Sequence, residues 1–140
     1  MKKRSVFYVL LLILIFLGGV SWEKVFGPIH GLTAADPKVR QRAVEDMATS
    51  WVPDRVTRLT AALKDAAVEV RIAAACVLGS IGGEAAISPL IDALQDADPR
   101  MREAAAAALG KIGHPALDPL IGALEHEDVR VRMGAASGMS

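Results

Sequence analysis

A sequence repeat with a step of 30–31 residues is the feature that most constrains how this chain can fold. Four arginines keep this step, and the residue before each is Val or Met: Arg40, Arg71, Arg102 and Arg132. A column of leucines keeps it as well: Leu32, Leu63, Leu94 and Leu124. A fixed period of this length is typical of stacked repeats, in which each unit packs only against its neighbours.

Residues 96–113 form the clearest copy of the repeat, and local chemistry marks the ends of a helix inside it. Asp98 belongs to the residue types that accept hydrogen bonds from the first amides of a helix. Pro99 has its φ already set for the first helical position, and Gly113 suits the left-handed residue that closes a helix. We therefore predict a helix over 99–112.

The other copies predict helices in antiparallel pairs joined by tight turns. The expected ranges are about 22–32, 37–49, 54–64, 68–81, 85–95, 99–112, 116–125 and from 129 onward. Alanine and leucine supply much of the 52% hydrophobic content, and no run alternates with period two, so strands are not expected. The predicted class is all-α, a short right-handed α-solenoid with repeats at about 22–50, 51–82, 83–113 and 114–140, the last incomplete.

A hydrophobic segment precedes the predicted repeats. Basic residues at positions 2–4 are followed by an apolar run over 6–17 and then by small residues up to Ser21. Residues 1–21 are either a signal peptide or a signal anchor, and residues 5–21 of the anchor would span about 25 Å as a helix. We favour the anchor, because Trp22 suits the far membrane interface. Both interpretations place the repeats outside the cytoplasm, membrane-tethered or, after cleavage, secreted or periplasmic.

Charge and cysteine content narrow the possible partners. The net charge is zero, but three of the 16 basic residues lie at positions 2–4, which leaves 13 basic and 16 acidic residues in the rest of the chain. This balance argues against nucleic-acid binding. The single Cys76 cannot form an intrachain disulfide, and its place in an alanine-rich helix favours a small packing residue.

The best-preserved segments resemble the HEAT repeats, and within them the short HEAT-like units first noted in phycobilisome lyases. The residues that carry the resemblance are PLIDAL at 89–94, REAA at 102–105 and LGKIG at 109–113, and the first of these returns as PLIGAL at 119–124. The resemblance covers about residues 32–140 and implies the stacked helical hairpins predicted above.

The resemblance also implies a ladder of hydrogen bonds between repeats, made by an aspartate in the turn inside a repeat and an arginine six residues later. Two pairs match this pattern, Asp65 with Arg71 and Asp96 with Arg102. Ala34 and His126 take the place of the acid in the first and last units, so we expect interruptions at both ends. Structural pairing is the favoured role of these arginines, because a charge near the core must be paired. Ligand contact is the alternative.

A second column stands at the start of the same helices: Lys38, Glu69, Arg100 and Arg130. Cations beside exposed helix amides would form an edge that attracts anions weakly. We favour a solvated face over an anion site.

No catalytic, cofactor or metal constellation is expected. A helix of about 15 Å separates His114 from His126, so these two cannot share a metal. Deoxyhypusine hydroxylase, a HEAT-like enzyme, carries His-Glu pairs at the start of its second helices to hold two irons. The corresponding dipeptides here are Ile72-Ala73, Glu103-Ala104 and Met133-Gly134.

These observations favour a non-catalytic scaffold that binds a protein or peptide on the concave side of the solenoid. The resemblance to HEAT repeats implies that the second helix of each unit lines this side. The residues expected to face this groove are Gln41, Ile72, Glu103 and Met133, followed one turn later by Glu45, Cys76, Ala107 and Ser137. The alternative is an enzyme or accessory factor acting on a protein substrate, similar to bilin lyases or to deoxyhypusine hydroxylase.

The expected partners are a protein or peptide and, through residues 5–21, a membrane, but no nucleic acid. The last helix carries Gly134 and Gly138, which lower its stability, and Ser140 corresponds to Gly110, two residues before the expected end of the helix. We expect either a truncated sequence or a C-terminal end that a partner or a second copy covers.

Overall fold

The computed structural model describes residues 22–50, 52 and 54–140, and every regular element within them is helical. The elements are α2 (Trp22–Gly31), α3 (Pro37–Asp46), α4 (Arg55–Ala62), α5 (Val68–Ile81), η1 (Glu84–Ala86), α6 (Ile87–Ala93), α7 (Pro99–Ile112), α8 (His114–Ala123) and α9 (Val129–Gly138). The all-helical expectation is confirmed for this part of the chain. The hydrophobic helix expected over residues 5–21 lies outside the described residues.

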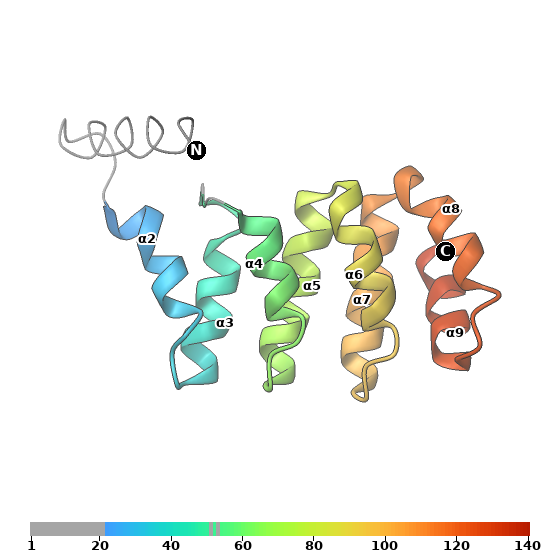
Figure 1. Ribbon diagram of the computed structural model, residues 1–140, viewed down its shortest axis with the longest axis horizontal. Coiled ribbons are helices and arrows are strands. Elements are labelled where there is room, and N and C mark those ends of the chain that lie inside the picture. The colour runs from blue at the N-terminus through green and yellow to red at the C-terminus, as the bar shows by residue number, and fades with distance from the viewer. Residues whose placement is uncertain (1–21, 51, 53) are drawn as a thin grey trace, which may run out of the picture.

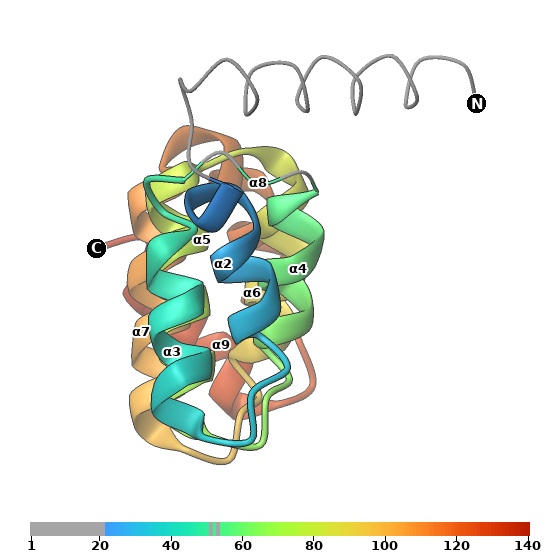
Figure 2. The ribbon, with the colours of Figure 1, turned by 90° about the vertical axis from the view of Figure 1, so that its left-hand side faces the viewer.

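Consecutive helices form antiparallel hairpins, and the hairpins stand side by side in a row (Figure 1). The row has two layers, with α2, α4, α6 and α8 in one and α3, α5, α7 and α9 in the other (Figure 2). In the second layer, α5 packs against both α3 and α7, and α7 packs against α9. Each hairpin thus contacts only its neighbours, as expected for a stacked repeat.

Aspartates begin three of the second-layer helices in the predicted manner. The side chains of Asp36, Asp98 and Asp128 each accept a hydrogen bond from the backbone N–H two residues later. Helix α7 spans the range predicted from its caps, and Gly113 closes it with a φ of +72°. A residue with a Cβ rarely adopts this conformation, which explains the glycine.

Other helix boundaries differ from the predicted ones by a few residues. Helix α8 begins at His114 rather than 116, because Pro115 fits the first turn of a helix. Helix α3 ends at Asp46 instead of 49, and a short 3₁₀ turn precedes α6. Local turn geometry decides such ends, and the repeat period does not encode it.

The core lies between the two layers and follows the same period as the sequence. Leu59, Leu90 and Leu120 occupy equivalent buried positions in the first layer. The second layer contributes three further columns of buried residues: Val70, Met101 and Val131; Ala74 and Ala105 with Ala135; and Met47, Leu78 and Leu109. Because each column crosses several hairpins, one hairpin alone would leave its apolar side exposed to water.

Neighbouring hairpins come very close at two glycines of the second layer, Gly79 and Gly134. A Cβ built on Gly79 of α5 would lie 2.7 Å from the Cα of Ala108 in α7. A Cβ on Gly134 of α9 would lie 2.6 Å from Cδ2 of Leu94. Packing between hairpins therefore requires the glycine at Gly79, where the neighbour is backbone, whereas at Gly134 the neighbour is the end of the Leu94 side chain.

Candidate functional site

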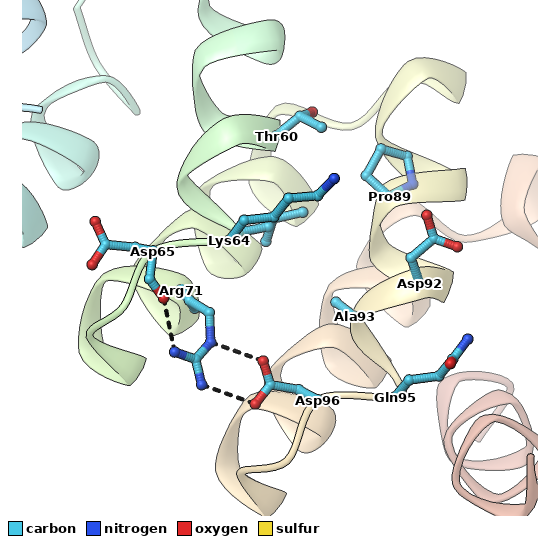
Figure 3. A pocket seen from close by; sticks show the side chains of 10 residues that line it. Thr60, Lys64, Asp65, Arg71, Pro89, Asp92, Ala93, Gln95 and Asp96 are labelled. Atoms are coloured by element: carbon cyan, nitrogen blue, oxygen red, sulfur yellow. Dashed lines mark hydrogen bonds and ion pairs between the residues drawn. The ribbon is translucent and has the colours of Figure 1, made fainter.

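Two arginine–aspartate pairs link consecutive hairpins. Arg40 donates from Nε to Oδ2 of Asp65 at 2.8 Å and from Nη2 to Oδ1 at 2.9 Å. Arg71 makes the same two contacts with Asp96, at 2.8 and 2.9 Å (Figure 3). A guanidinium and a carboxylate that meet through two parallel hydrogen bonds form a strong and directional pair. We call each of these pairs a rung.

The same arginines also fasten the turn of their own hairpin. Nη1 of Arg71 donates to the carbonyl oxygens of Asp65 and Ala66, at 2.9 and 3.3 Å. Three further arginines make equivalent contacts to two consecutive turn carbonyls: Arg40, Arg102 and Arg132. The guanidinium therefore takes one fixed orientation in all four units, with Nε and Nη2 left for the following hairpin.

The aspartate of each rung is held by its own backbone as well. Oδ1 of Asp65 accepts from the Ala67 amide at 2.8 Å, and Oδ1 of Asp96 accepts from the Asp98 amide at 2.9 Å. The hydrogen bond from Arg40 lowers the pKa of Asp65 below its usual range. Partial burial by itself raises the pKa of Asp96, but the hydrogen bonds from Arg71 and the Asp98 amide outweigh it and lower the pKa.

The rungs run between hairpins, as the resemblance implies, but the interruption expected at the first unit is not found. Each arginine pairs with the aspartate 25 residues later, in the next hairpin, and reaches only the backbone of its own turn. Arg40 therefore belongs to a rung although Ala34 replaces the acid in its own hairpin. Arg102 is the exception, because the residue at the rung position of the next hairpin is His126.

His126 takes over only part of the aspartate's role. Its Nδ1 accepts from the Asp128 amide at 3.0 Å, as Oδ1 of the aspartates does in the other turns. Arg102 and Arg132 each donate to two turn carbonyls, and no acidic side chain among the described residues pairs with either. The third rung is thus missing, while the turn that contains His126 keeps the same backbone hydrogen bond as the other turns.

Two of the four residues in the second column, Arg100 and Arg130, form ion pairs with the aspartate two residues before them. Arg100 pairs with Asp98 at 2.8 Å and lies 3.9 Å from Glu69. Arg130 pairs with Asp128, and this contact holds the pKa of Asp128 at about 2. Because these guanidinium groups are already paired with carboxylates, they are poor sites for a further anion, which favours a solvated face.

The four residues expected to face the groove all lie on the second layer, but their exposure differs. Gln41 is half-buried and donates to Glu45 at 2.8 Å, and Glu103 is exposed. Ile72 is half-buried against the core, two helical turns before Gly79 on the side of α5 that meets α7. Met133 is 69% exposed on α9. The residues one turn later are all exposed: Glu45, Cys76, Ala107 and Ser137.

A shallow hollow of about 470 Å³ lies beside the second rung, between α4 and α6 (Figure 3). Lys64 and Asp92 lie on its two sides, and Arg71 and Asp96 form part of its lining. The rung already satisfies the charges of Arg71 and Asp96, so the polar side chains that remain for a ligand are those on the rim of the hollow, among them Lys64 and Asp92.

In the part of the chain that the structure describes, no group of three or more His, Cys, Asp or Glu residues is arranged to hold a metal ion. No helix of these residues is both long and apolar enough to cross a membrane. Residues 5–21, which we expect to contact a membrane, lie outside this part of the chain.

Stacked antiparallel hairpins with a repeating core and an arginine ladder define a helical-repeat protein. A family model for HEAT repeats matches residues 28–108 and again 87–140. The chain belongs to the HEAT-repeat family, whose members commonly bind protein partners. A comparison of the chain with curated proteins found no match.

Proposed function

We propose that this protein is a scaffold that binds a protein or peptide along the layer formed by α3, α5, α7 and α9. The observation that carries the proposal is the exposure of equivalent residues on all four helices: Glu45, Cys76, Ala107 and Ser137. Because the hairpins stand in a row, these residues form a strip that crosses the whole array. A partner can therefore touch several repeats at once.

The chemistry of this strip suits an extended polypeptide. Cys76, Ala107 and Ser137 have small side chains, which let a partner backbone approach the helices closely. Glu45 and Glu103 are acidic and exposed beside them. A surface with small residues at its centre and charges around them matches the mixed polarity of non-obligate protein interfaces. We infer a partner segment with basic and apolar side chains.

The sequences at 89–94 and 119–124 further support a subtype with the short phycobilisome-lyase-type repeat. A shared fold does not imply a shared activity. The resemblance therefore supports the scaffold and leaves the substrate-directed role of bilin-lyase-like or deoxyhypusine-hydroxylase-like proteins without a supporting residue here.

We also propose that residues 5–21 tether the scaffold to a membrane, with the repeats on the extracytoplasmic side. The basic residues at positions 2–4 and the apolar run after them support this orientation. Membrane fractionation with mass measurement of the N-terminus tests it. An intact N-terminus in the membrane fraction supports the anchor, and a chain that starts after Ser21 in the soluble fraction supports cleavage.

Site-specific photocrosslinking tests the binding strip. A photoreactive residue at Ala107 of the full chain should capture one defined protein, and the same residue at Ser88 should not. Ser88 is exposed on α6, in the opposite layer, so it is the matched control. The captured protein is then purified, and the A107R variant should weaken its binding at least tenfold. Equal capture at both positions, or unchanged binding by A107R, would contradict the strip as the site.

A further inference from the structure

The hollow between α4 and α6 carries opposite charges on its two walls. Lys64 stands just after the end of α4, and Asp92 lies in the last turn of α6 (Figure 3). Both residues are exposed, and neither side chain forms an ion pair or a hydrogen bond within the described residues. The hollow therefore presents one cation and one anion, each without a partner in this part of the chain.

The position of Asp92 is unfavourable for a carboxylate that has no cation beside it. The carbonyl oxygens at the end of a helix carry partial negative charge, so an anion in the last turn opposes the helix dipole. No basic residue of α6 lies in that turn to compensate. The equivalent residues of the neighbouring hairpins, Ala61 and Gly122, are uncharged. The fold thus does not need a carboxylate here, whereas a cationic group of a ligand would be attracted by both the carboxylate and the helix end.

The gaps on either side of the hollow lack this pair of charges. Gln95 takes the place of Lys64 in the gap between α6 and α8, and Thr33 takes it in the gap between α2 and α4. Thr60, which also lines the hollow, corresponds to isoleucine in both neighbouring gaps. Stacking of the hairpins therefore does not require polar residues at these positions. Their presence in one gap indicates a role that belongs to that gap.

The second rung fixes the distance between the two walls of the hollow. Arg71 belongs to the hairpin that contains α4, and Asp96 follows α6 in the next hairpin. Their two hydrogen bonds, 2.8 and 2.9 Å long, therefore hold Lys64 and Asp92 on opposite sides of the same space. A site whose walls are fixed before binding loses little conformational freedom when a ligand arrives. The volume of about 470 Å³ is in the range of small-molecule sites.

We propose that the hollow binds a small zwitterion, an α- or ω-amino acid, with its ammonium group against Asp92 and its carboxylate against Lys64. A ligand with a single charge would satisfy only one of these two residues and would bind more weakly. Thr60 and Gln95 line the same space and offer hydrogen bonds to the ligand's charged groups. The inference is additional to the proposed scaffold, because the hollow lies on the first layer and the binding strip on the second.

Two-dimensional ¹H–¹⁵N NMR of the full chain, in an uncharged detergent, tests the site. The probes are glycine, 4-aminobutanoate and 6-aminohexanoate, which separate the two charges by increasing lengths. At millimolar concentrations, at least one probe should produce saturable shifts of the amide signals of Lys64, Asp92 and Gln95. The amine and the carboxylate of the same chain length, each with one of the two charges, should bind at least tenfold more weakly.

Substitutions on the two walls separate this site from general ion binding. K64Q and D92N should each weaken binding of the zwitterion at least tenfold. The double variant K64D/D92K exchanges the two charges and should restore most of the affinity, because the ligand can bind in the reverse direction. K111Q and D118N, which remove an exposed lysine and an exposed aspartate elsewhere, are the matched controls and should bind like the wild type.

Any of four results would overturn the inference. These are the absence of saturable shifts with every probe, single-charge compounds that bind as tightly as the zwitterion, wall variants that bind like the controls, and a charge exchange that does not restore binding. The NMR spectrum of each variant also checks its fold, and all of the substituted residues are exposed. Photocrosslinking at Ala107 concerns the opposite layer, so the zwitterion site and the binding strip can fail separately.

Discussion

Arg71 and Asp96 meet through two parallel hydrogen bonds, 25 residues apart in the chain and on consecutive hairpins. The same guanidinium closes the turn of its own hairpin through Nη1. One side chain thus fixes both the shape of a turn and its distance from the next one. The contact is geometrically demanding, and for this reason a small change at either residue should be measurable.

A double-mutant cycle measures this rung. Each of R71A and D96A should lower the free energy of unfolding, because each leaves a half-buried charge without its partner. The coupling energy between the two changes should be about 1–2 kcal/mol. Urea denaturation of the single and double variants gives the value. A coupling near zero would mean that the rung contributes to geometry but not to stability.

Replacing His126 with aspartate should build the missing rung. In H126D the new carboxylate can accept from the Asp128 amide, as Asp96 does from Asp98, and can face Nε and Nη2 of Arg102. The expected gain is about 1 kcal/mol in the free energy of unfolding, measured by urea denaturation.

The matched control for H126D is A34D. It creates the same turn aspartate in the first hairpin, where the residue 25 positions earlier is Val9 and not an arginine. A34D should therefore change stability by no more than a few tenths of a kcal/mol. Equal effects of the two substitutions would show that the gain comes from the turn and not from Arg102.

Acid should weaken the fold over a defined range of pH. Asp65, Asp96 and Asp128 have pKa values below the ordinary 3.8 in the folded state, that of Asp128 at about 2. A lowered pKa in the folded state stabilises the protein above the pKa of the unfolded state, and this contribution is lost as the pH falls. The free energy of unfolding should therefore decline from about pH 4 to about pH 2.

The D128N variant should make this decline shallower, because asparagine can still cap α9 but does not titrate. D54N is the control, since Asp54 makes no side-chain hydrogen bond to the start of α4. Urea denaturation at a series of pH values gives the slopes. An unchanged slope in D128N would show that the pairing with Arg130 does not contribute.

Substitution at Gly79 should be costly. The added methyl group of G79A would meet the backbone of Ala108, which cannot move aside without separating α5 from α7. We expect a loss of about 2–3 kcal/mol. In G122A, the new Cβ on α8 has no atom within 4 Å, so alanine's better helix propensity should leave the protein equally stable or slightly more stable. Thermal and urea unfolding of the two variants test the contrast.

The sequence predicted the helices because their ends depend on local signals and their order on a periodic one. Asp98, Pro99 and Gly113 act on their own helix, so the ends of α7 could be predicted to the residue. The buried columns follow the 31-residue step, since each hairpin repeats the same packing. The period alone does not fix burial, however, because Leu94 is fully buried whereas Leu124, in the same column, is 37% exposed.

The register of the rungs could not be predicted in the same way. The recurrence of Asp65 with Arg71 indicates a ladder between repeats, but it does not tell which aspartate each arginine meets, and the structure pairs Arg71 with Asp96. The spacing between hairpins decides which aspartate an arginine meets, and this spacing is not evident from the sequence. Ile72, which we expect to face a groove, is half-buried against the core on the side of α5 that carries Gly79.

Each rung joins an arginine to the aspartate of the following hairpin, and this direction determines how the array can change its length. Excision of residues 66–96 would place Asp65 directly before Ala97, which keeps the Arg40 rung and leaves Arg102 at the correct distance to close the turn. Duplication of such a unit would add one complete rung. Recombination between the copies in the gene can therefore shorten or lengthen the protein without leaving an uncompensated charge between its hairpins.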